Sequence, residues 1–346
     1  MVENPEKISP DKLEAFRKML LPAGQRIVVV SHTNPDGDAI GAALACRRLL
    51  TGMGHEVCAV VPNYFPSFLA WMPDIEQLQI AKGDSDGKIV AAIQAADIII
   101  CVDFNQIERL EQLGEAIAAN THARRVLIDH HPGSPVGYDL AFSSPASSST
   151  SYLIFKIIEA IAGSDAVDAA MAELLYVGMM TDTGNFSFGN LTPELFRAVA
   201  VLLEKGIDIP AINAQVYNDF SEGRMRLLGY ALSQKMEVMK SYGAAFICLK
   251  ENELRRFNFQ IGDSEGFVNY PLSIREIKMS AMFLQTRHFI RVSLRSRGEV
   301  DVNLFARRYF AGGGHRNASG GKSFTTMEET ADRFRAAVAE FMKSEP

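Results

Sequence analysis

Apolar residues recur in two different patterns over the first two hundred positions, one typical of buried strands and one typical of helices. Short apolar runs, typical of strands buried on both faces, occupy 27–30, 55–61, 98–102 and 126–128. Helical spacing follows over 39–50, 152–161 and 169–180, and Thr192-Pro193 begins a further helix by its capping chemistry. Because strands that alternate with helices form parallel sheets, these residues predict a doubly wound α/β domain.

A second pattern begins after residue 208. Residues 209–232 are helical and polar, and we interpret them as a linker between a domain over 1–208 and a domain over 233–346. The second domain shows strand patterns near 237–239, 244–249, 277–284 and 289–294, with helices from 251, 301 and 328. We expect a smaller α/β domain, in which the last helix serves packing alone through Phe334, Val338 and Phe341.

Side chains that can bind metals follow the predicted strands of the first domain. Ligands of open α/β sheets bind at the carboxyl ends of the strands. The residues in question are His32, Asp36 and Asp38 after the first strand, Asp103 after the third, Asp129, His130 and His131 after the fourth, and Asp182 after a helix. A capping role for Asp38 and a solvated turn at 130–131 are the plain alternatives. Four such coincidences in one domain favour a cation site, because crowded carboxylates repel one another without one.

Composition and charge narrow the class of protein. The 346 residues are 47% hydrophobic and 22% charged, which is ordinary for a globular protein of two domains. The net charge of −6 divides into −11 over residues 1–232 and +5 over 233–346, so the first domain suits cations and the second suits phosphates. No apolar run approaches the length of a membrane span, and the N-terminus lacks a signal-peptide pattern. The four scattered cysteines predict reduced thiols and a cytoplasmic location.

The basic second domain contains a cluster of arginines and a glycine run. Guanidinium groups suit a second phosphate, and Gly312–Gly314 can present backbone N–H groups to an anion. Several of these arginines will be ordinary surface residues, and the best candidates are Arg295, in the sequence RSRG, and Arg316, beside the glycines. The cluster comprises Arg275, Arg287, Arg291, Arg295, Arg297, Arg307, Arg308 and Arg316.

These motifs carry a family resemblance. The segments HTNPDGDAIG, VD at 102–103, DHH at 129–131 and TDTGNF at 181–186 resemble the four motifs of the DHH phosphoesterases. The segment GGGHRNASG at 312–320 resembles the signature of the type-1 DHH-associated domain. Together the motifs span residues 26 to 321 in the order typical of the family.

The resemblance implies a site with two divalent cations and a hydroxide between them. His32, Asp36 and Asp103 would hold one cation, and Asp38, His130 and Asp182 the other, with Asp103 shared. Oxygen and imidazole donors without thiolate favour Mn²⁺. His131 is expected to face the phosphate or to serve as a hydrogen-bond partner, and Asp129 to orient a histidine. The expected substrate-binding residues are Arg295, Ser296, Gly313, Gly314, His315, Arg316 and Asn317.

Among the branches of the family, the chain resembles most the nano-RNases that also dephosphorylate adenosine 3′,5′-bisphosphate (pAp). Such enzymes are expected to act on short oligoribonucleotides and phosphorylated nucleotides without a membrane, and we leave a homodimer open. A stand-alone cyclic-dinucleotide phosphodiesterase is the first alternative, followed by a RecJ-like exonuclease or an exopolyphosphatase. A nucleotide sensor without turnover is disfavoured, because all six ligand positions are present.

Overall fold

The computed structural model describes residues 8–110 and 112–344. The chain divides into two compact units between Asp219 and Phe220. This boundary falls inside the segment expected to link the domains, and each of the two helices of that segment packs within a different unit. Helix α8 (Ile209–Tyr217) places Ile212 and Val216 in the core of the first unit, whereas α9 (Glu222–Tyr230) places Leu227 in a core of the second.

The first unit is built on a six-stranded parallel sheet, which confirms the predicted fold class. The strand order is β3-β2-β1-β4-β5-β6. Two short strands, β3 and β6, were not predicted. The strands are β1 (Arg26–Val30), β2 (Glu56–Val61), β3 (Leu78–Ile80), β4 (Ile98–Val102), β5 (Arg124–Asp129) and β6 (Leu140–Ser143).

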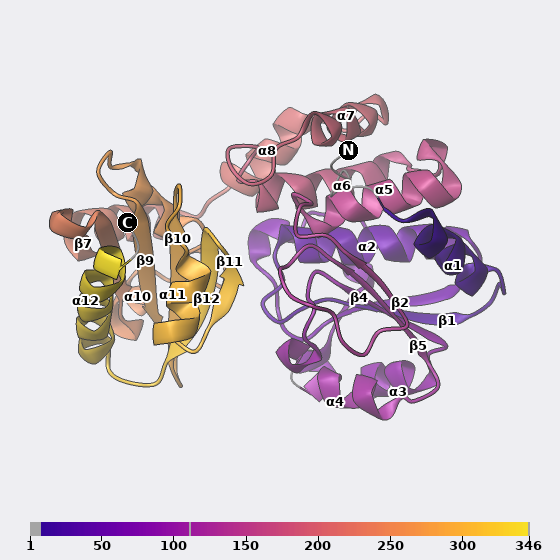
Figure 1. Ribbon diagram of the computed structural model, residues 1–346, viewed down its shortest axis with the longest axis horizontal. Helices are drawn as coiled ribbons and strands as arrows, with labels where there is room; N and C mark the ends of the chain where they lie inside the picture. The colour runs from indigo at the N-terminus through magenta and orange to yellow at the C-terminus, as the bar shows by residue number, and fades with distance from the viewer. Residues whose placement is uncertain (1–7, 111, 345–346) are drawn as a thin grey trace. The chain divides into compact units, whose positions relative to one another are not determined.

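Helices cover both faces of this sheet. Figure 1 shows α2, α5 and α6 on one side and α3 and α4 on the other. Alternate residues of each strand therefore enter different cores: Val29 and Ile100 face the first group of helices, and Val28 and Ile99 the second. The helices of the unit, besides α8, are α1 (Pro10–Leu20), α2 (Gly37–Gly52), α3 (Lys88–Ala95), α4 (Gln112–Ala119), α5 (Thr150–Ala162), α6 (Ala169–Asp182) and α7 (Pro193–Glu204).

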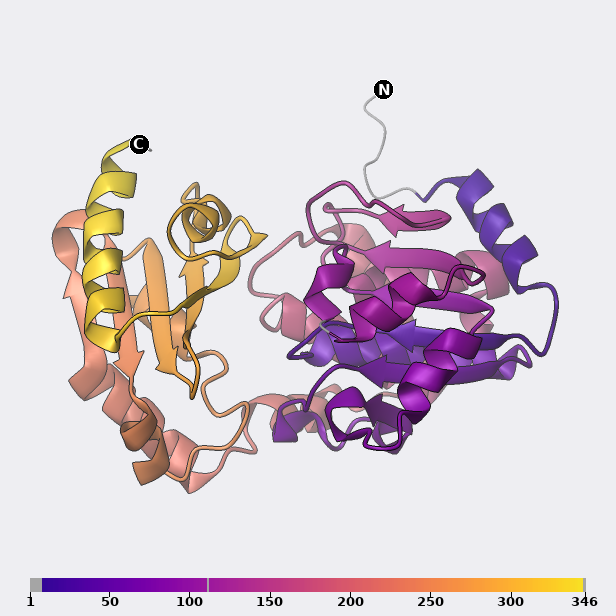
Figure 2. The same ribbon diagram turned by 90° about the horizontal axis from the view of Figure 1, so that it is seen from below.

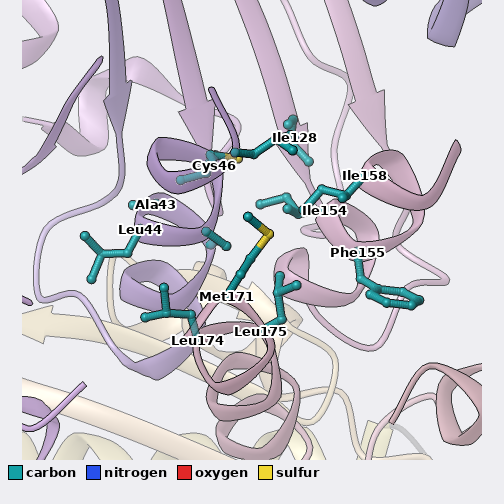
Figure 3. Close-up of a cluster of buried hydrophobic side chains, with 14 of the residues drawn as sticks. Ala43, Leu44, Cys46, Ile128, Ile154, Phe155, Ile158, Met171, Leu174 and Leu175 are labelled. Atoms are coloured by element: carbon teal, nitrogen blue, oxygen red, sulfur yellow. The ribbon is translucent and has the colours of Figure 1, made fainter. Parts of the chain in front are cut away.

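Helices α2, α5 and α6 pack closely because small residues lie at their contacts. A Cβ atom added to Gly41 of α2 would lie 2.4 Å from the carbonyl oxygen of Leu174, and one added to Gly178 of α6 would lie 2.0 Å from Ser151 Oγ. Larger apolar side chains fill the space between these helices and the sheet (Figure 3). The glycines thus bring α6 against the first turns of α2 and α5.

The second unit contains a mixed six-stranded sheet of order β11-β12-β10-β9-β8-β7, in which only β8 and β9 pair in parallel. The glycine run lies partly in an edge strand, β11, and was not predicted to pair. The elements, besides α9, are β7 (Met236–Met239), β8 (Ala244–Leu249), α10 (Glu251–Arg256), β9 (Met279–Gln285), β10 (Ile290–Ser296), α11 (Val302–Tyr309), β11 (Gly313–His315), β12 (Ala318–Ser323) and α12 (Met327–Ser344).

Two separate cores flank the second sheet. On one face α11 and α12 pack Phe305 and Phe334 against Phe283 of β9, and Figure 2 shows α12 running along this face. The predicted packing role of Phe334, Val338 and Phe341 is confirmed, since all three are buried in this core. On the other face α9, α10 and a short helical turn at 267–273 cover β8 and β9.

Candidate metal centre

The carboxyl ends of β1 and β4 lie side by side at the point where the strand order reverses. Strand β1 pairs with β2 on one side and with β4 on the other, so the loops that follow β1 and β4 leave toward opposite faces of the sheet. His32 lies on the first of these loops, and Asp103 directly follows β4. Ligands of doubly wound folds bind at such a switch point.

His32, Asp36 and Asp103 form the first cluster at this edge. Their potential ligand atoms all lie within 4.8 Å of one another. His32 Nε2 is 3.2 Å from Asp103 Oδ2, and His32 Nδ1 is 2.9 Å from the carbonyl oxygen of Thr33. In the neutral ring, a hydrogen bond to that carbonyl places the proton on Nδ1 and leaves Nε2 as the donor atom for a cation.

Asp36 also begins helix α2. Its Oδ1 accepts hydrogen bonds from the backbone N–H groups of Asp38 (3.1 Å) and Ala39 (3.0 Å). The alternative of a capping role for Asp38 is therefore wrong, because Asp36 holds the cap position and Asp38 lies inside the helix, buried. Asp36 thus caps α2 through Oδ1 and also belongs to the cluster with His32.

Asp38, His130 and Asp182 form the second cluster, again with ligand atoms within 4.8 Å of one another. His130 Nε2 lies 3.3 Å from Asp182 Oδ2, 3.9 Å from Asp38 Oδ2 and 3.5 Å from Asp103 Oδ1. The Asp103 carboxylate thus presents Oδ2 to His32 and Oδ1 to His130. It stands between the two clusters, as a shared ligand must.

The serine-rich segment before α5 positions two of these carboxylates. Asp38 Oδ2 accepts the backbone N–H of Thr150 at 2.7 Å, and Oδ1 accepts that of Ser151 at 2.8 Å. The hydroxyl of Thr150 donates to Asp103 Oδ1 at 2.9 Å. The first turn of α5 therefore binds the Asp38 carboxylate, as a helix N-terminus binds an anion. Sequence reasoning missed Thr150, although the serine-rich start of this helix was its signal.

Asp103 adopts an unusual backbone conformation. Its φ of 66° lies in the left-handed region, which non-glycine residues enter at a cost of about 1–3 kcal/mol. Its N–H donates to the carbonyl oxygen of Ile128 at 3.0 Å, so pairing with β5 holds the residue in place. The strain turns the buried carboxylate back toward both clusters.

His131 and Asp129 form a pair beside the clusters. Asp129 is fully buried, and its Oδ1 lies 2.8 Å from His131 Nδ1. Within the described residues, Asp129 Oδ2 has no hydrogen-bond partner. This geometry agrees with the expectation that Asp129 orients a histidine, and it directs His131 Nε2 away from the carboxylate.

The clusters concentrate negative charge that the imidazoles neutralise in part. Burial, and then the charges of Asp103 and Asp182, raise the pKa of Asp38 well above its ordinary value. Burial also raises the pKa of Asp182, to about 6. Burial alone would lower the pKa of His130, but Asp182, Asp103 and Asp38 outweigh it and raise that pKa to about 9. The site therefore favours added positive charge, which a divalent cation supplies.

The pKa of Asp103 is shifted in the opposite direction from the pKa values of Asp38 and Asp182. Its burial would raise the pKa of the carboxyl, but the hydrogen bond with His32 and the nearby charges of His131, His32 and His130 lower it below its ordinary value. The carboxylate at the centre of the arrangement is thus the one that stays ionised most readily. That property suits a ligand shared between two cations.

The expected substrate-binding residues all lie in the second unit, and two of them brace a turn. Ser296 Oγ donates to the carbonyl oxygen of Val300 at 2.6 Å. Asn317 Nδ2 donates to Ser296 Oγ at 2.8 Å and to the carbonyl oxygen of Gly298 at 3.1 Å. These bonds fix the turn after β10, in which the sequence RSRG ends.

The glycine run and its neighbours lie at the edge of the second sheet. A Cβ atom on Gly312 would lie 1.9 Å from the carbonyl oxygen of Gly320, so close packing of the chain requires this glycine. The N–H of Gly314 donates to Asn303 Oδ1 at 3.1 Å. Arg316 forms an exposed ion pair with Glu299 at 2.5 Å.

His315 ends β11, and Arg295 lies half-buried on β10, one strand beyond β12. None of the helices in the described part of the chain is both long enough and apolar enough to cross a membrane.

Comparisons with known proteins agree with this architecture. Residues 26–179 match the DHH family, N-terminal domain, and residues 244–344 match the DHHA1 domain. A crystal structure of an exopolyphosphatase-related protein from Bacteroides fragilis superposes with a TM-score of 0.92 at 38% identity, and the match covers 99% of each chain.

Among the relatives that carry a functional name are two bacterial proteins that match nearly the whole chain. The probable bifunctional oligoribonuclease and PAP phosphatase NrnA of Streptococcus mutans is 28% identical over 91% of this chain and 96% of its own. The bifunctional oligoribonuclease and PAP phosphatase NrnA of Thermus thermophilus is 27% identical over 97% of this chain and 96% of its own. With the fold, the order of the motifs and these matches in agreement, the chain belongs to the DHH family and carries a DHHA1 domain in its second unit.

Proposed function

We propose that this protein is a metal-dependent phosphoesterase that hydrolyses short oligoribonucleotides to mononucleotides and removes the 3′-phosphate of pAp. The observation that carries the proposal is the position of Asp103, whose two carboxylate oxygens face the two clusters described above. Relatives that cover nearly the whole chain are named for both activities, which supports the choice of substrates.

The donor atoms fit a pair of divalent cations. Four carboxylates and two imidazoles, with no thiolate, are an oxygen-rich set that suits Mn²⁺, the ion we propose. His32, Asp36 and Asp103 would hold one ion, and Asp38, Asp103, His130 and Asp182 the other. Bound cations of this kind activate water and withdraw charge from phosphate oxygens.

The side chains around the ligands have separate tasks in the proposed reaction. Thr150 fixes the Asp103 carboxylate, and the first turn of α5 fixes Asp38. His131, held by Asp129, is the proton donor that we assign to the leaving oxygen or to the phosphate. The second unit supplies Arg295, His315 and Arg316 for a further phosphate, with the backbone of Gly313 and Gly314 beside them.

The four free cysteines support a cytoplasmic location.

The test is a hydrolysis panel with Mn²⁺ that contains pAp, a diribonucleotide, cyclic di-AMP and polyphosphate. We expect the highest kcat/KM on pAp and on the diribonucleotide. Preference for cyclic di-AMP would contradict the proposal, and so would preference for polyphosphate. Polyphosphate is the main alternative substrate, because the Bacteroides fragilis relative is named as exopolyphosphatase-related.

Asp103→Asn serves as the matched variant in this panel. The neutral amide keeps the shape of the side chain and tolerates the left-handed backbone, but it cannot balance the charge of two cations. We expect loss of turnover on every substrate with an unchanged melting profile in the absence of metal. Near-native kcat at saturating Mn²⁺ would remove Asp103 from the site.

A further inference from the structure

One half of the second sheet carries an open face. On this side α9, α10 and the turn at 267–273 pack on β8 and β9, and the turn also contacts β10. Their apolar cluster includes Met282 and Leu284 of β9. Within the described residues, that cluster contains no side chain of β10, β11 or β12. The opposite sides of these three strands face the core under α11 and α12. Their outer sides therefore form a surface of partly exposed residues.

Strand register places the residues of this surface in cross-strand rows. Residues directly opposite one another in paired strands point to the same face. Arg291 pairs with Lys322, Ser293 pairs with Gly320, and Arg295 pairs with Ala318. Across the next pair of strands, Gly313 lies opposite Gly320 and His315 opposite Ala318. We call this surface the open strip; it comprises Phe289, Arg291, Ser293, Arg295, His315, Ala318, Gly320, Lys322 and Phe324.

An aromatic pair lies at one end of the open strip. Phe289 precedes β10 and Phe324 follows β12, and their ring centroids are 6.2 Å apart. Lys322 Nζ lies 4.9 Å from the centroid of Phe289, which places all three side chains on the same face. Phe324 is 73% exposed. A large ring so exposed, beside a second ring and a cation, offers a flat apolar surface to a partner.

Positive charge and small side chains make up the rest of the strip. Arg291 donates to Ser264 Oγ at 2.8 Å, while its Nε is buried and has no hydrogen-bond partner within the described residues. An acidic group, Glu265, lies 4.0 Å from its guanidinium. Between this arginine and Arg295, the surface consists of Ser293 and Gly320, so a polyanion can approach the backbone closely.

We propose that the open strip binds the part of an oligoribonucleotide that lies beyond its first nucleotides. Arg291, Lys322 and Arg295 would contact successive phosphates, and Phe289 and Phe324 would stack on a base. Stacking on aromatic rings and cationic contacts to the backbone are how proteins bind single strands without reading sequence. Polyphosphate has no base, so the aromatic pair favours RNA as the ligand.

The size of the strip agrees with a short strand. From Phe289 to Arg295 the chain spans about 20 Å at 3.4 Å per residue, enough for several nucleotides and not for a long strand. The inference rests on the proposed function, since it assigns one site of the same substrate. It adds a prediction that pAp, which has a single nucleoside and whose further phosphate is assigned to Arg295, His315 and Arg316, does not span the strip as far as the aromatic pair.

The experiment compares full-length variants on ligands of different length. Phe324→Ala and Lys322→Gln alter exposed side chains and leave both cores intact, and Phe196→Ala, at a 49% exposed phenylalanine of α7, is the matched control. Two readouts are needed: fluorescence anisotropy of a labelled pentaribonucleotide in EDTA, and kcat/KM with Mn²⁺ on pAp, a diribonucleotide and the pentaribonucleotide. We expect both variants to weaken pentaribonucleotide binding about tenfold, with pAp hydrolysis within twofold of wild type.

Each outcome separates this inference from the proposed function. If the variants bind and cleave the pentaribonucleotide as the control does, or lose pAp and pentaribonucleotide activity equally, the open strip is not a length-dependent site. The same conclusion follows if the wild type does not bind the pentaribonucleotide in EDTA. A different result would support the open strip as a binding site and contradict the proposed function. In that case the wild type binds the pentaribonucleotide, the variants do not, and no RNA is hydrolysed.

Discussion

Gly178 links the packing of α6 to the geometry of the metal centre, and Gly178→Ala tests that link. The added Cβ would lie 2.0 Å from Ser151 Oγ, 2.6 Å from Ser151 Cβ and 2.7 Å from Asp38 Oδ1. Real Cβ atoms do not approach other atoms so closely, so α5 or α6 must shift. The same shift displaces the N–H group that Ser151 donates to Asp38. We therefore expect this variant to lose both stability and activity.

The size of the effect follows from the crowding. Overpacking a close-packed interior by one methyl group costs about 1–3 kcal/mol. For a unit of this size, each kcal/mol lowers the melting temperature by about 2–4 °C. Calorimetry of the full chain should then show the transition of the first unit lowered by about 2–12 °C. Activity with Mn²⁺ should fall more than stability explains, because Asp38 is a proposed ligand.

Two further variants complete this test. Gly52→Ala, at the end of α2, places its Cβ where no atom lies within 4 Å, and it should leave both readouts unchanged or slightly improved. Combining Gly178→Ala with Ser151→Gly removes the two closest contacts and should recover part of the lost stability. Native stability and activity in Gly178→Ala alone would show that the helices are not held at the contact described here.

Three other predictions concern single groups. Thr150→Val removes the hydroxyl that donates to Asp103 Oδ1 and should weaken Mn²⁺ affinity or activity about 10–100-fold, measured by metal titration and initial rates. Arg295→Ala and Arg316→Ala should lower kcat/KM on pAp by about 2–4 kcal/mol and change hydrolysis of bis-p-nitrophenyl phosphate much less, whereas equal losses would refute a role in phosphate recognition. Burial raises the pKa of the Cys101 thiol to about 12, so at pH 8 the folded protein should resist alkylation there, which mass spectrometry can check.

The sequence predicted those parts of the fold that depend on local patterns. Buried strands such as Ile98–Val102 and helices such as α7 need only periodicity and caps, and both lie where they were expected. The three-residue strand β3 has no such pattern and forms because β2 offers an edge. The glycine run becomes an edge strand for the same reason, through pairing with β12.

In the candidate site, too, the sequence predicts what depends on neighbouring residues and misses contacts between residues far apart in the chain. Each of the six proposed ligands could be picked out because it follows a strand or helix of recognisable pattern, but the contact between Thr150 and Asp103 joins residues far apart in the chain. The pairing of Phe289 with Phe324 depends on the register of β10 against β12. The sequence alone does not give this register, so it could not bring the two aromatic residues together.

The left-handed backbone at Asp103 limits how this protein can change over evolutionary time. Only glycine, asparagine and aspartate enter that conformation readily, and of these only aspartate carries a negative charge. Glutamate, an acceptable exchange at many metal sites, would need both a strained backbone and more room for a buried side chain. Aspartate is therefore the one functional residue at position 103, whereas asparagine and glycine can keep the backbone conformation but not the function. A descendant chain that has lost catalysis there while keeping its fold should carry asparagine or glycine at 103.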